Sequence, residues 1–171
     1  MERLDVKRGL VKQVSENGGL VTLAREFFDD AKDSGGNSFS GSHGVMTSIN
    51  AHYNEKGALI VDVTNVAPDF EDTEAVKAAM DDRKRWTSFL DAATGYNSKQ
   101  RGDKAKEWAK KASKANSAIS AARHFMSMSD NIPEELVSQA DSIIAEIEEA
   151  LEQGDNTKAA GRAAKLTKLL D

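Results

Sequence analysis

The chain has 171 residues, a formal net charge of −5, 30% charged residues and only 6% aromatic residues. A chain of this length suits one domain, or one domain with an appendage, and can bury roughly 70% of its unfolded surface. The absence of cysteine excludes disulfides, thiolate metal sites and cysteine nucleophiles. Because no apolar run approaches the ~20 residues of a membrane-spanning helix, we expect a soluble cytoplasmic protein with no membrane partner.

The first part of the chain predicts a short strand followed by an amphipathic helix. Leu4 and Val6 alternate with polar residues, as they do in a strand with one buried face. Apolar residues between Leu20 and Ala31 recur at spacings of three and four, which predicts a helix over this segment. The sequence Asp-Ser-Gly-Gly-Asn at 33–37 ends the predicted helix in a loop.

The periodicity of the sequence then changes from helical to alternating. Two alternating runs, at 45–53 and 59–63, flank a glycine-containing turn at 54–57, which predicts an antiparallel hairpin. One face of this hairpin should pack on helices. The candidate members of that face are Ile49, Tyr53, Val61 and Val63.

The rest of the chain is predicted to be helical. We expect one helix from Asp69 to about Ala93, stopped by Gly95, and another from Ser98 to about Met128. Beyond a break at Pro133, the apolar stripes of two more helices predict a helical hairpin.

The predicted fold class is α+β, with a small antiparallel sheet packed on helices and a helical C-terminal half that ends in a helical hairpin. The sheet would contain the hairpin and an N-terminal strand. The expected parts of the chain are an α+β core at 1–96, a basic amphipathic helix at 97–128 and an acidic helical hairpin at 129–171.

The run from Phe89 to Arg101, Phe-Leu-Asp-Ala-Ala-Thr-Gly-Tyr-Asn-Ser-Lys-Gln-Arg, combines a helix stop with the start of a basic helix. In this run, and in the order of its elements over residues 1–110, the chain resembles a family of small uncharacterised archaeal proteins. The resemblance does not extend to the acidic segment after residue 130. It implies an archaeal cytosolic protein and supplies no activity.

Charge is concentrated in two blocks. Residues 97–125 contain eight cations and two anions, a net charge of +6, whereas residues 130–171 contain four cations and ten anions, a net charge of −6. On a helical wheel most lysines of the basic block gather on one arc, and Ala, Trp and Ile residues occupy the opposite arc. The candidate nucleic-acid-binding residues are Tyr96, Lys99, Arg101, Lys104, Lys106, Lys110, Lys111 and Lys114.

Three interpretations of this basic helix are open. Its lysines can bind nucleic-acid phosphates, they can keep an Ala-rich helix solvated, or they can pair with the acidic hairpin of the same chain. Our leading hypothesis is a non-enzymatic protein that binds RNA or a ribonucleoprotein surface. In this hypothesis the lysines neutralise phosphates and Tyr96 stacks on an unpaired base.

The C-terminal hairpin suggests an alternative function. In this alternative the protein is a protein–protein adaptor or associates with itself. Residues 131–171 would present one apolar face to a partner helix or to a second copy of the chain. The candidate interface residues are Leu136, Ile143, Ile147 and Leu166.

The sequence predicts no catalytic residue, metal site or cofactor. The Gly-Ser-His-Gly run at 41–44 lacks the strand–turn–helix context of a nucleophile elbow. His43 and His52 are nine residues apart, so on a regular strand they face opposite sides and do not form a metal pair with Asp62. We expect both histidines to be half-exposed strand residues.

Overall fold

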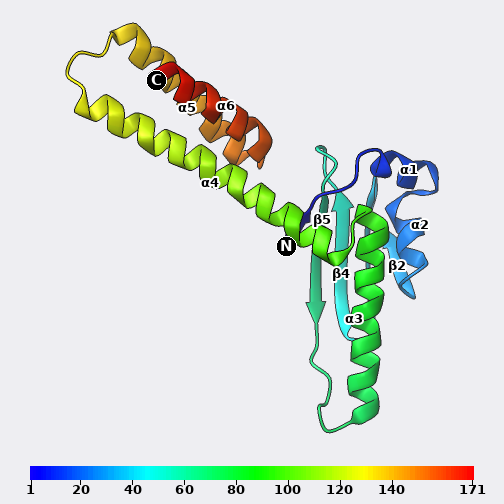
Figure 1. The fold of residues 1–171 in the computed structure, drawn as a ribbon. Coiled ribbons are helices and arrows are strands. Elements are labelled where there is room, and N and C mark those ends of the chain that lie inside the picture. Colours follow the sequence, from blue (N-terminus) through cyan, green and yellow to red (C-terminus); the bar gives the residue numbers. More distant parts are fainter. The chain divides into compact units, whose positions relative to one another are not determined.

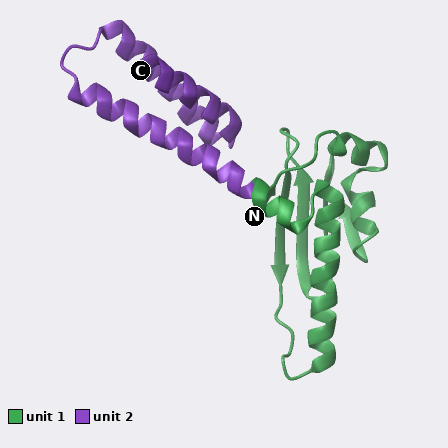
Figure 2. Cartoon of the chain, in the orientation of Figure 1, with its two compact units in different colours: residues 1–104 green, residues 105–171 purple.

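The computed structural model describes all 171 residues and contains two compact units, residues 1–104 and residues 105–171 (Figure 2). The α+β fold class is confirmed, with a five-stranded antiparallel sheet in the first unit and helices in the second. The three-part organisation expected from the sequence stays a prediction. No helix is both long enough and apolar enough to cross a lipid bilayer.

The first unit is an antiparallel sheet with helices on one face (Figure 1). The strands are arranged in the order β1-β5-β4-β3-β2. The elements of this unit are β1 (Glu2–Leu4), α1 (Leu10–Glu16), α2 (Gly19–Arg25), β2 (Asp30–Asp33), β3 (Ser38–His43), β4 (Met46–Tyr53), β5 (Leu59–Asn65) and α3 (Thr73–Thr94).

The predicted hairpin is confirmed as β4 and β5. Along β4, buried Ile49, Ala51 and Tyr53 alternate with exposed Asn50 and His52, so one face of the strand enters the core. The register pairs β4 with β5 along both strands. All four residues expected to face the helices belong to the core or pack against it, namely Ile49, Tyr53, Val61 and Val63.

The helix expected from Leu20 to Ala31 is wrong in its second half. The backbone amides of Phe27 and Phe28 bond to the Ala24 carbonyl, which closes α2 soon after Arg25. Ala31 then pairs with Gly41 in the β2–β3 ladder. Phe28 lies in the segment between α2 and β2, and its side chain is buried in the core. Its spacing from the apolar residues of α2 is the same as in a helix, which is why the sequence predicts that the helix continues.

The ends of α3 are set by local side-chain and backbone chemistry. The helix begins at Thr73, later than the predicted Asp69, because the Asp72 carboxylate accepts hydrogen bonds from the amides of Glu74 and Ala75. It stops at Gly95 as predicted, and this glycine adopts a φ of 74°. A side chain would strain the backbone in this left-handed region.

An aromatic cluster joins the sheet to the helices in the first unit. The ring of Phe89 on α3 lies 5.1 Å from Phe28 and 5.5 Å from Phe39 on β3, measured between centroids. Trp86 packs 5.5 Å from Phe89. The buried Tyr53 hydroxyl donates a hydrogen bond of 2.6 Å to the Ala93 carbonyl, which ties β4 to the end of α3.

The second unit is a three-helix bundle. It contains most of α4 (Ser98–Met128), followed by α5 (Glu134–Glu152) and α6 (Asn156–Leu170). Helix α4 begins at Ser98, as the sequence predicts. Small residues fill much of the core and allow close helix packing. The buried residues are Ala115, Ile119, Ala122, Ala140, Ile144, Ile147, Ala150, Ala159, Ala163 and Leu166.

Candidate functional site

A row of three lysines lies on the exposed face of α4 in the second unit. Lys106, Lys110 and Lys114 are spaced by four residues, so their side chains follow one another about 6 Å apart along one face of the helix. All three are exposed, and their ammonium groups make no hydrogen bond or ion pair with the protein. We call these residues the lysine row.

The acidic helix α5 does not neutralise the lysine row. Its carboxylates instead form ion pairs of 2.7 Å with arginines, Glu148 with Arg123 and Glu146 with Arg162. The row is therefore not paired with the acidic hairpin, which was one of the three interpretations of the basic helix.

The other lysines predicted to bind nucleic acid are engaged with neighbours. Lys99 forms an i,i+4 ion pair of 3.1 Å with Asp103. The Lys104 ammonium lies 5.8 Å from the centroid of the Tyr96 ring, a cation–π contact that occupies both predicted residues. Lys111 donates a hydrogen bond of 3.1 Å to the Thr157 hydroxyl.

Arg101 has a structural position that the sequence did not reveal. Its side chain is only 7% exposed and pairs with the Asp91 carboxylate at the end of α3. The same guanidinium donates to the Tyr96 carbonyl and to the Ser98 hydroxyl. With its donors turned toward the protein, Arg101 does not belong to an exposed phosphate-binding surface.

The predicted protein interface is largely covered by the chain itself. Ile147 and Leu166 are fully buried in the three-helix core, because the apolar face of α4 packs on the hairpin. Leu136 and Ile143 are partly buried. The expectation that all four residues face a partner is wrong for Ile147 and Leu166.

His43 is not half-exposed as expected. Its side chain is 12% exposed and lies between two carboxylates. Nδ1 accepts a hydrogen bond of 3.3 Å from the Asp29 amide, and Nε2 lies 3.4 Å from Oδ1 of Asp82. The other carboxylate oxygen of Asp82 accepts a hydrogen bond of 3.0 Å from the Val45 amide. This arrangement attaches the β3–β4 turn to α3.

The structure contains no group of three or more His, Cys, Asp or Glu side chains placed to hold a metal ion. His52 lies on the exposed face of β4. The hydroxyl of Ser42 contacts the Asp30 carboxylate at 3.4 Å rather than an imidazole. The Gly-Ser-His-Gly run thus forms a strand end and a turn.

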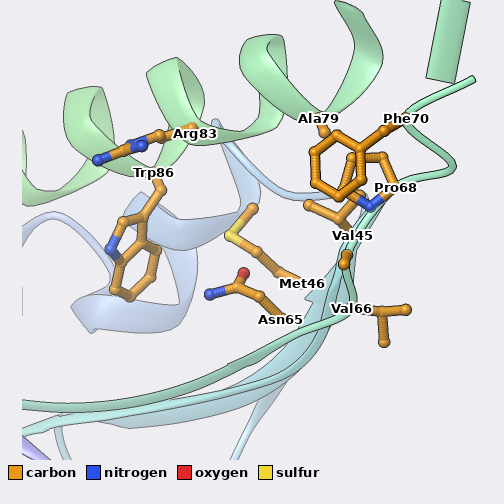
Figure 3. A pocket seen from close by; sticks show the side chains of 10 residues that line it. Val45, Met46, Asn65, Val66, Pro68, Phe70, Ala79, Arg83 and Trp86 are labelled. Carbon is orange, nitrogen blue, oxygen red and sulfur yellow. The ribbon is translucent and has the colours of Figure 1, made fainter. Parts of the chain in front are cut away.

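A pocket of about 610 Å³ was missed by sequence reasoning (Figure 3). It lies between α3, the start of β4 and the segment that follows β5. The only sequence signal was Phe70, an aromatic residue between the acidic residues Asp69 and Glu71. The pocket is lined by Val45, Met46, Asn65, Val66, Ala67, Pro68, Phe70, Ala79, Arg83 and Trp86.

Comparison with protein families gives a match to a model described as a domain of unknown function, DUF5611, over residues 1–107. The matched region contains the whole sheet, α3 and the first part of α4. Comparisons with curated proteins and with solved structures found no match.

Proposed function

Because the chain belongs to the DUF5611 family, whose function is unknown, we propose a function from its surface chemistry: the lysine row binds the phosphate backbone of RNA. The observation that supports this proposal is the alignment of three exposed ammonium groups that have no acceptor in the chain. All three lysines lie in the C-terminal unit, and only Lys106 falls within the matched residues 1–107, so most of the proposed site lies outside the family domain.

The lysine row favours contact with the backbone over the reading of bases. Each lysine offers a compact point charge, whereas bidentate base recognition normally uses arginine, and the row contains none. Contacts of this type are independent of sequence and release counterions from the nucleic acid. We therefore propose a non-enzymatic, cytoplasmic protein that attaches to RNA or to a ribonucleoprotein without strong sequence preference. An archaeal origin stays a prediction.

The adaptor hypothesis has less support. Only Leu136 and Ile143 of its predicted residues reach the surface, and both are partly buried. Two such side chains are too few for the apolar centre of a stable interface. A protein partner for residues 131–171 stays a prediction.

The RNA proposal is tested by the salt dependence of binding. Fluorescence anisotropy with a labelled 20-nucleotide single-stranded RNA should give log K against log salt with a slope of about −2, because three neutralised phosphates each contribute about −0.7. Raising salt from about 50 to 200 mM should therefore weaken binding about 20-fold. Binding that is absent at low salt, or that does not change with salt, would reject the proposal.

A charge-reversal pair tests the location of the site. Lys106→Glu with Lys110→Glu should abolish binding, since two of the three contacts become repulsive. The matched control is Lys165→Glu with Lys168→Glu, which makes the same change in net charge at two exposed positions of α6. Equal loss in both variants would show that net charge, and not the lysine row, controls binding. The affinity for a DNA strand of the same sequence, measured in the same way, shows whether the protein distinguishes RNA from DNA.

A further inference from the structure

The pocket between α3 and the β4–β5 end of the sheet has the size and lining of a small-molecule site. Its volume of about 610 Å³ falls within the range of roughly 300–1,000 Å³ found for ligand pockets. Eight of its ten lining residues are apolar, and the remaining two are Asn65 and Arg83. A mostly apolar wall with a few polar groups is typical of sites that orient a small ligand.

The walls of the pocket expose apolar surface that an occupant would cover. Phe70 is 77% exposed and Val66 is 55% exposed, which is unusual for large apolar residues that line a concave surface. Met46, 2% exposed, belongs to the core beneath. Figure 3 shows Phe70 and Trp86 at opposite ends of the cavity, with Met46 and Asn65 between them. An apolar group in this space would contact aromatic rings at both ends.

The polar groups of the pocket select an anion. Arg83 is exposed and makes no hydrogen bond or ion pair with the protein, and the Asn65 side-chain amide is also without a partner. The lining contains no Asp or Glu. The neighbouring carboxylate of Asp82 does not neutralise Arg83, since its two oxygens lie against the Val45 amide and the His43 ring.

From these observations we propose that the pocket binds a small apolar molecule with a single carboxylate. The guanidinium of Arg83 has the planar fork that matches a carboxylate with two parallel hydrogen bonds. Trp86 and Phe70 contact the apolar part of the ligand. A cationic amphiphile is excluded by the charge of Arg83. This site lies in the family domain and is independent of the lysine row.

The test uses the full chain and two probes of equal length, octanoate and 1-octanol, in isothermal titration calorimetry. Octanoate should bind with one site per chain, and 1-octanol should bind at least about tenfold more weakly because it lacks the charge. Arg83→Gln should reduce octanoate affinity to the level of 1-octanol. The matched control is Lys84→Gln, which removes the same charge from the adjacent residue, outside the pocket, and should leave affinity unchanged.

A second variant examines the apolar wall. Phe70→Ala alters a side chain that is mostly exposed, so the fold should be retained, and it should weaken octanoate and 1-octanol by the same factor. The indole N–H signal of Trp86 should shift on addition of octanoate in a nuclear magnetic resonance spectrum. The proposal is overturned if octanoate does not bind, if Arg83→Gln binds it as tightly as the natural chain, or if Lys84→Gln loses as much affinity as Arg83→Gln.

Discussion

Replacing Gly44 by alanine should destabilise the first unit because this glycine lies directly against Asp82. Its φ is 53°, and a Cβ at this position would lie 2.0 Å from Oδ2 of Asp82. The left-handed backbone costs alanine about 1–2 kcal/mol. Moving the carboxylate away breaks its charge-assisted hydrogen bond with the Val45 amide, which contributes about 1.5–3 kcal/mol. We expect Gly44→Ala to lower the free energy of unfolding by about 2.5–5 kcal/mol.

The assay is urea unfolding followed by tryptophan fluorescence. Each unit contains one tryptophan, Trp86 in the first and Trp108 in the second, so Trp86 alone reports on the first unit in a Trp108→Phe background. In an Asp82→Ala background the obstacle is gone, and Gly44→Ala should cost only the backbone contribution of about 1–2 kcal/mol. Equal costs in the two backgrounds would refute the reasoning, because Asp82 would then not oppose the added methyl group.

Further predictions concern three other buried side chains. Tyr53→Phe should destabilise the first unit by about 1–2 kcal/mol, since the Ala93 carbonyl loses its donor. Burial raises the pKa of Tyr53, so above about pH 10 the unfolded chain loses a proton that the folded chain keeps. The free energy of unfolding should therefore fall by about 1.4 kcal/mol per pH unit above this pH. If Tyr53→Phe shows the same fall in stability above pH 10, the fall does not come from Tyr53. Arg101→Ala should lower the free energy of unfolding by about 2 kcal/mol in thermal unfolding and leave the RNA affinity of the folded protein unchanged. A large loss of RNA affinity would show that Arg101 does contact RNA. Ile147→Ala should cost about 3 kcal/mol as measured by Trp108 fluorescence, and a cost below about 1 kcal/mol would show that this face is not part of the core.

The elements with regular periodicity could be predicted from the sequence. The hairpin and the four helices after residue 69 were found because their buried residues repeat at two or at three to four positions. β2 and β3 were missed for a physical reason. The sequence of β3 is Ser-Phe-Ser-Gly-Ser-His, in which only Phe39 is a large apolar residue, and Gly41 and His43 take the other core-side positions. A strand with one apolar side chain has no recognisable alternation.

The candidate sites could be predicted only in part. The lysine row follows from a four-residue spacing, which a sequence displays directly. The burial of Arg101 depends on Asp91, ten residues away and on another helix, so no local pattern indicates it. The pocket combines residues from three separate segments, and none of them forms a motif. Spacing within one element is visible in a sequence, whereas a cavity depends on how elements pack.

The edge strand β2 has a consequence for how molecules of this protein behave toward one another. It is four residues long, and three of these residues, Asp30, Lys32 and Asp33, are charged. A strand from a neighbouring molecule would need to align its own amides beside these charges and displace their hydration. Charged and short edge strands oppose such pairing. The β2 edge therefore resists pairing with a strand of another molecule, and concentrated solutions should not seed fibrils through it.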